Sequence, residues 1–70
     1  MYEERTPEEM LNELNRRREE LTQKLEELQR QHEKGLISDE EYANESKKIQ
    51  RELVEVMDRI VQMEFLSGYR

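Results

Sequence analysis

The chain of 70 residues contains no cysteine and no tryptophan, and it has one proline, one phenylalanine and one histidine. Without cysteine, neither a disulfide framework nor a thiolate metal site can form. Hydrophobic residues never follow one another for more than a pair, such as Ile60-Val61, so no segment of the sequence could span a membrane. Residues 1–5 contain no apolar signal segment, which favours a cytoplasmic or other intracellular protein over a secreted one.

Charged residues make up 43% of the chain and hydrophobic residues 33%, and the formal net charge is −6. This composition approaches that of disordered proteins, but the regular spacing of the hydrophobic residues indicates amphipathic helices. Acidic and basic residues are mixed along the whole chain, which is typical of a solvated helix surface with ion pairs. Because a domain this small buries little surface, ideal helix packing or self-association must stabilise it.

The first helix is expected to begin at Pro7 and to end near Lys34. Thr6 and Glu9 have the spacing of a capping box, and proline is favoured at the first helical position. Gly35 follows the helix, where glycine tolerates a positive φ. Between these ends, a seven-residue repeat of mostly leucine predicts a seam along one side of the helix. Its positions are Leu11, Leu14, Arg18, Leu21, Leu25, Leu28 and His32.

The second helix is expected over residues 39–66. Ser38 and Glu41 form a second capping box, and Ile37 and Tyr42 have the spacing of a hydrophobic staple across it. Ser67-Gly68 is the expected end of this helix. The seam of this helix again follows a heptad, and its positions are Tyr42, Ser46, Ile49, Leu53, Val56, Ile60 and Met63.

Residues 35–38 leave room only for a short turn, and so short a connection forces the two helices into an antiparallel hairpin. The predicted fold class is therefore all-α, with one coiled-coil-like two-helix hairpin over residues 1–70. In the expected register, Leu21 lies near Leu53, and Arg18 lies near Val56. Both termini meet at the end of the hairpin opposite the turn.

The second helix carries more apolar surface than one partner helix can cover. Apolar residues beside the seam, together with the seam itself, make an arc of roughly 200° at 100° per residue. One neighbouring helix covers only about 100° of such a face. We therefore expect a second partner, of which the simplest is another copy, giving a homodimer and a four-helix bundle. The alternative is that these residues are isolated exposed hydrophobics. The expected interface consists of Met10, Val54, Met57, Val61, Phe65 and Leu66.

The basic residues of the first helix have two interpretations. Arg18 occupies a seam position, and Glu52 and Glu55 of the second helix are its expected partners. Together with Arg17, these charges would give the pairing its specificity. The alternative for Arg18 is that its aliphatic stem packs at the seam while its guanidinium reaches water. The run Arg16-Arg17-Arg18 is also the only basic run of the chain, so contact with nucleic-acid phosphates is an alternative.

Few side chains could carry chemistry. His32 is interpreted as a partly exposed seam residue beside the turn, with a metal ligand or proton shuttle as the alternative. The Glu-x-x-His pair of bundle metal sites is absent, because Gln29 stands three positions before His32. Glu64 lies inside the apolar arc, either as an ion-pair partner at an interface or as a solvated residue. With no phosphate-binding loop or catalytic motif, we expect no enzymatic activity, no metal and no cofactor.

The middle of the chain resembles a widespread helical hairpin. The residues that carry the resemblance are Leu25-Glu26-Glu27-Leu28, Lys34-Gly35-Leu36-Ile37-Ser38-Asp39-Glu40-Glu41-Tyr42 and Lys48-Ile49. They are similar to the short C-terminal domain (SHOCT) pattern, in which a leucine helix, a glycine turn and an acidic cap precede a second helix. A similar turn occurs in gas-vesicle G-type proteins. The resemblance implies an interaction or oligomerisation module.

Three functions are therefore open from the sequence. The first is a non-enzymatic protein-interaction or assembly module that self-associates through the second helix. The second is a small acidic inhibitor, of the kind phages use, that blocks a basic site on a nucleic-acid-processing protein. Its carboxylates would be Glu19, Glu26, Glu33 and Glu40. The third is direct nucleic-acid binding through residues 16–18, against which the negative net charge argues.

Overall fold

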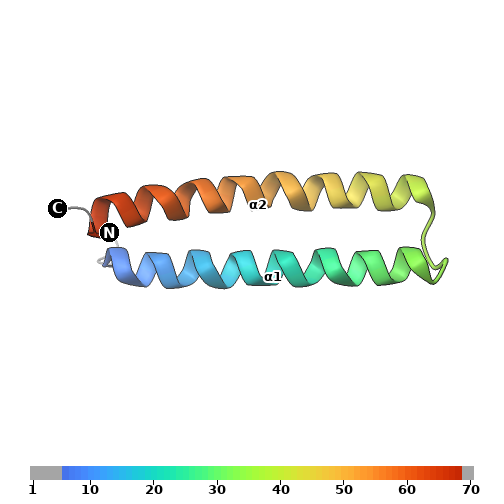
Figure 1. Ribbon diagram of the computed structural model, residues 1–70, viewed down its shortest axis with the longest axis horizontal. Helices are drawn as coiled ribbons and strands as arrows, with labels where there is room; N and C mark the ends of the chain where they lie inside the picture. The colour runs from blue at the N-terminus through green and yellow to red at the C-terminus, as the bar shows by residue number, and fades with distance from the viewer. Residues whose placement is uncertain (1–5, 69–70) are drawn as a thin grey trace, which may run out of the picture.

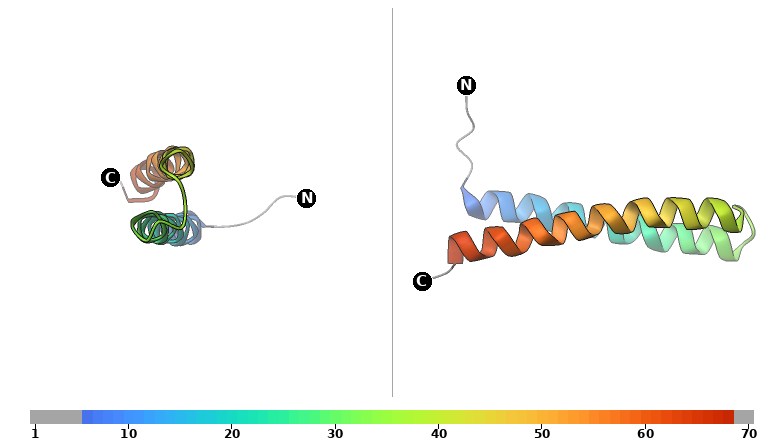
Figure 2. Two further views of the ribbon diagram at one scale, coloured as in Figure 1. Left: turned by 90° about the vertical axis from the view of Figure 1, so that its right-hand side faces the viewer. Right: turned by 90° about the horizontal axis from the view of Figure 1, so that it is seen from above.

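The computed structural model describes residues 6–68, which form two antiparallel helices, α1 (Pro7–Glu33) and α2 (Asp39–Gly68). The helices lie side by side along their whole length, and the turn lies at one end (Figure 1). Seen from above, they cross at a shallow angle (Figure 2), as expected for helices that pack through heptad seams. The predicted all-α antiparallel hairpin is confirmed.

The helix boundaries differ slightly from those predicted. Helix α1 ends at Glu33, one residue earlier than expected, and Lys34 is its C-cap. Helix α2 includes Ser67 and Gly68 and so extends two residues beyond the expected position 66, and its last described residue lies in the predicted Ser67-Gly68 end. A glycine ends a helix where it adopts a positive φ, and Gly35 alone does so among the described glycines.

Both helices begin with the capping boxes that the sequence predicts. Thr6 Oγ1 accepts a hydrogen bond from the Glu9 amide (3.1 Å), and Glu9 Oε1 accepts one from the Thr6 amide (3.0 Å). Ser38 and Glu41 repeat this exchange at 3.0 and 3.3 Å. Each box satisfies backbone donors that have no partner inside the helix, and its carboxylate interacts favourably with the helix dipole.

The turn after α1 is a Schellman motif. Gly35 has a φ of +75°, and its amide donates to the His32 carbonyl (3.0 Å). The Leu36 amide donates to the Gln31 carbonyl (2.9 Å), which completes the pair of hydrogen bonds that defines the motif. The chain is therefore reversed within a few residues, and Ser38 is placed at once to cap α2.

Gly35→Ala is expected to destabilise the hairpin through backbone conformation alone. A Cβ atom at this position would meet nothing within 4 Å, so the cost is that of a positive φ. That cost is about 1–2 kcal/mol for an L-residue. For a chain of this size, each 1 kcal/mol lowers the melting temperature by about 4–8 °C. Thermal denaturation followed by circular dichroism measures the shift, and Gln50→Ala on the exposed side of α2 is the control. Equal melting temperatures for the two variants would contradict the prediction.

The core is a thin layer between the helices. Leu21 of α1 is 1% exposed, and Val56 and Ile60 of α2 are similarly buried. The seam residues that pack around this cluster are half-buried, and they are Leu11, Leu14, Ile49 and Leu53. The heptad prediction therefore identifies the core.

His32 and Tyr42 close the end of the hairpin near the turn. Their rings stack with centroids 4.3 Å apart and planes 8° from parallel. His32 Nε2 also donates a hydrogen bond to Asp39 Oδ1, in the first turn of α2 (2.6 Å). The stack places the last seam residue of α1 against the first seam residue of α2, which confirms the expected register at this end.

Candidate interaction surface

The second half of α2 carries a row of exposed hydrophobic side chains. Val54 is 67% exposed, Val61 is 62% exposed, and Met57 is almost half exposed. Apart from these, the exposed large hydrophobic residues of the described chain are two near the end of α2 and Leu36 in the turn. We call the α2 residues the outer row, and its members are Val54, Met57, Val61, Phe65 and Leu66.

The outer row lies beside the buried seam because of the helical repeat. Met57 follows the buried Val56, and Val61 follows the buried Ile60, so each is rotated by about 100° from its buried neighbour. Val54 and Val61 are seven residues apart and therefore lie on one face, two turns from each other. Helix α1 covers only the side of α2 that carries the seam, and it leaves this second apolar face exposed.

Residues of the predicted interface line two neighbouring hollows of the surface. Val61 and Leu66 line a shallow, almost entirely apolar depression together with Gln62 and Phe65. Met10 is half-buried in a groove between the helices that Arg17 and Met63 also line. Gln62 lines both this groove and the depression, so the groove adjoins the end of the outer row, and a role of Met10 in an interface stays a prediction.

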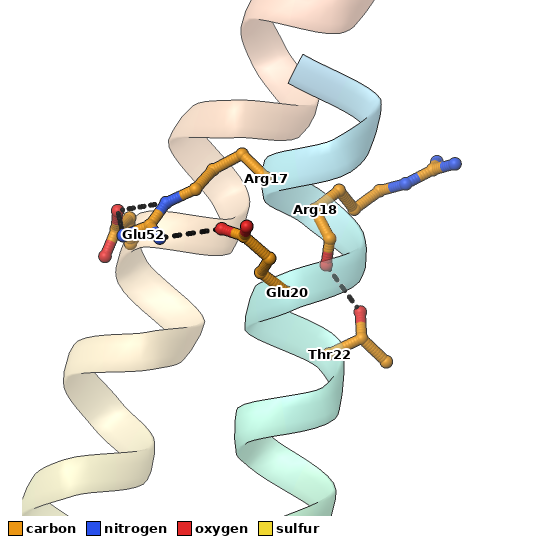
Figure 3. A network of polar contacts seen from close by, with 5 residues as sticks. All are labelled: Arg17, Arg18, Glu20, Thr22 and Glu52. Carbon is orange, nitrogen blue, oxygen red and sulfur yellow. Dashed lines mark hydrogen bonds and ion pairs between the residues drawn. The ribbon is translucent and has the colours of Figure 1, made fainter. Parts of the chain in front are cut away.

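Arg17 joins the two helices on that flank. Its Nε donates to Glu52 Oε2 (3.0 Å), and its Nη2 binds the same oxygen. Its Nη1 donates to Glu20 Oε1 (3.2 Å), so one guanidinium connects carboxylates of α1 and α2 (Figure 3). The hydrogen bonds that Arg17 donates to Glu52 and then to Glu20 raise the pKa of Arg17 above its ordinary value.

Arg18 does not have the role that the heptad predicts. It is exposed and points away from α2, and its backbone carbonyl also accepts a hydrogen bond from the hydroxyl of Thr22 (2.9 Å) (Figure 3). Glu52 pairs with Arg17 instead, and in the described chain Glu55 forms no ion pair with either arginine. A guanidinium stays hydrated unless an acceptor faces it, and Glu52, the expected partner of Arg18, faces Arg17.

A rule of coiled coils could have identified the Arg17–Glu52 pair. Residues that flank a heptad seam commonly form ion pairs between helices, whereas residues within the seam are apolar. Arg17 precedes the seam position 18, and Glu52 precedes the seam position 53. Both residues flank the seam, and they lie at matching heights of the hairpin. Ion pairs between the two helices are therefore predicted better from the flanking positions than from the seam positions.

The remaining candidates are distributed over separate faces. Arg16 and Arg18 are exposed while Arg17 is engaged with α2, so the basic run does not form one patch. Glu64 is exposed. Within residues 6–68, no group of three metal-ligating side chains is brought together, and neither helix is long and apolar enough to cross a membrane. Surface ion pairs also occur within α1, where the hydrogen bond from Arg30 lowers the pKa of Glu27.

Fold and surface together define a small helical hairpin with one apolar face left uncovered. No family model, curated protein or solved structure matches the chain. Its function must therefore be argued from the hairpin itself.

Proposed function

We propose that the chain is a non-enzymatic assembly module that self-associates through the outer row of α2 as a two-fold dimer, forming a four-helix bundle. The observation that carries the proposal is the exposure of Val54 and Val61 on a second apolar face of a helix whose first face is already covered by α1. The resemblance of residues 25–49 to an oligomerisation hairpin supports the same class of function.

The free energy available from this face is large for so small a protein. Fully burying a valine, leucine, methionine or phenylalanine side chain contributes about 1.5–3 kcal/mol. Most of that contribution is unrealised at Val54, which is 67% exposed, and at Leu66, which is 69% exposed. Contiguous exposed apolar patches are characteristic of interaction surfaces, whereas scattered single residues are not. From Val54 to Phe65 the outer row is contiguous, since these four members recur every three or four residues.

A second copy of the chain is the partner that matches this face most simply. In a two-fold interface the same patch contacts itself, so each copy supplies an apolar row of the length that the other requires. The opposite face of α1 offers no comparable row, because no exposed large hydrophobic residue lies on α1 within the described chain. Contact between α2 and the α2 helix of a second copy is therefore the arrangement that buries the most apolar surface.

Solution mass tests the proposal directly. Light scattering over a concentration series from about 1 to 500 μM is expected to give twice the chain mass of 8.6 kDa, with dissociation only toward the lowest concentrations. A helical chain that remains at 8.6 kDa throughout would contradict self-association and would leave the outer row to a different protein partner.

A further inference from the structure

Two residues of opposite charge border the outer row without an ion pair in the described chain. Arg18 directs its guanidinium away from α2, and no carboxylate of residues 6–66 forms an ion pair with it (Figure 3). Glu64 is exposed near the end of α2, and no cation of the same residues forms an ion pair with it. Each of these charges is thus available to a partner molecule.

Arg18 and the outer row from Val54 to Phe65 lie toward the same flank of the hairpin. The Arg17–Glu52 ion pair marks one flank, and Arg18 is rotated by about 100° from Arg17 around α1. Val61 follows Glu52 by nine residues, about two and a half turns, so it lies on the opposite side of α2. Glu64 shares this side, because it follows Met57 by seven residues and therefore lies on the same face.

The heights of these residues follow from the stack at the turn. His32 and Tyr42 face each other, and Arg18 and Val56 each lie 14 residues from that pair along their own helices. Since both helices rise by about 1.5 Å per residue, Arg18 lies at the height of Val56. Arg18 is therefore level with the first part of the outer row, between Val54 and Met57.

An antiparallel second copy would place Glu64 at that same height. When two copies of α2 run in opposite directions and are centred on the outer row, Met57 of each lies opposite Val61 of the other. Position 56 is then opposite position 62, which is about 3 Å along the axis from Glu64. A parallel arrangement would instead place Glu64 beside its own symmetry mate, and like charges so close oppose association.

Building on the proposed dimer, we propose that the second copy packs antiparallel on α2 and that Arg18 of each chain pairs with Glu64 of the other. The pair occurs twice by symmetry, on either side of the apolar contact. Its role is to fix the direction and register of the two copies, while the outer row supplies the affinity. Arg18 thus contributes to the contact between the two copies, although it does not pack between α1 and α2 of its own chain.

Charge reversal tests the pairing. Arg18→Glu and Glu64→Arg, made singly, are each expected to raise the dimer dissociation constant about tenfold at low salt, because like charges then face each other twice. The double variant restores the pair in reversed order and should return to within about threefold of the native constant. The penalties of the single variants should shrink at 1 M salt, since the charges lie at a wet edge.

Arg16→Glu is the matched control, because it changes the net charge as Arg18→Glu does but lies on the outer side of α1. It is expected to leave the dissociation constant within about threefold of native, and combining it with Glu64→Arg should bring no rescue. If the changes in dissociation free energy caused by Arg18→Glu and Glu64→Arg are additive in the double variant, the two residues do not pair. The proposed dimer is not contradicted by that result. If the native chain is monomeric, the proposed self-association itself has failed.

The absence of cysteine allows an independent test of direction. A Met57→Cys chain mixed with a Val61→Cys chain is expected to form a mixed disulfide, because these positions face each other in the antiparallel arrangement. Val54→Cys alone should form no disulfide between copies, because two Cα atoms more than about 7 Å apart cannot be bridged. Efficient self-crosslinking of Val54→Cys would indicate parallel copies and would overturn the Arg18–Glu64 pairing.

Discussion

Leu21→Ala is expected to remove most of the stability of the hairpin. Leu21 is 1% exposed and lies at the centre of the buried cluster with Val56 and Ile60. Truncation of a buried leucine to alanine costs about 2–5 kcal/mol, because the lost apolar contacts leave a cavity. A core in a chain of this length rarely supplies more than about 3–5 kcal/mol of net stability. The helical circular-dichroism signal of the variant should therefore be largely lost at 25 °C at low protein concentration.

Leu36→Ala is the control for that experiment. It makes the same chemical change in a leucine that is 70% exposed in the turn, and substitutions at such positions usually alter stability by no more than about 0.5 kcal/mol. Urea denaturation of both variants and of the native chain, at one fixed concentration, separates the two effects. Similar losses at the two positions would show that the packing between α1 and α2 is not what stabilises the chain.

The sequence predicts the fold well because its local signals agree with one another. Capping boxes at Thr6 and Ser38, a positive-φ glycine at position 35 and two heptad seams all specify the same hairpin. Each of these signals acts over a few residues, so it can be recognised without knowing the rest of the structure. The end of α2 is less well predicted, because Ser67 and Gly68 can either continue a helix or end it.

The charged residues of the surface are harder to predict. The heptad places Arg18 and Leu21 in the same seam, yet Leu21 is buried while Arg18 extends into solvent. A long flexible side chain reaches water from many positions, so its Cα position does not determine where its charge lies. The direction of Arg17 depends on Glu52, 35 residues later, and such a pairing becomes evident only once the register is known.

The outer row is predicted from the sequence better than the surface charges are, but less completely than the fold. Helical spacing alone predicts that Val54, Met57 and Val61 share a face, and the structure shows that α1 leaves this face exposed. Met10 lines a groove between the helices that shares Gln62 with the end of the outer row, and its part in an interface stays a prediction. What covers the outer row depends on a second molecule, which the sequence of a single chain does not specify.

Val61→Glu is expected to dissociate the proposed dimer while preserving the hairpin. By two-fold symmetry the substitution introduces two carboxylates into one apolar contact, where neither can remain hydrated or find a cation. An increase in the dissociation constant of at least about 100-fold corresponds to roughly 2.7 kcal/mol, well within the cost of a poorly paired buried charge. The helix itself tolerates the change, since Val61 is 62% exposed in the single chain and glutamate favours helix more than valine does.

Light scattering and thermal denaturation of Val61→Glu together give a decisive result. The variant is expected to have the mass of one chain and a melting temperature independent of concentration, whereas that of the native dimer rises with concentration. Gln23→Glu adds the same charge on the far, exposed side of α1 and should behave as the native chain does. A native mass and a native concentration dependence for Val61→Glu would show that any dimer forms elsewhere. The outer row would then serve no self-association, since a surface that accepts a glutamate without effect is not buried between copies.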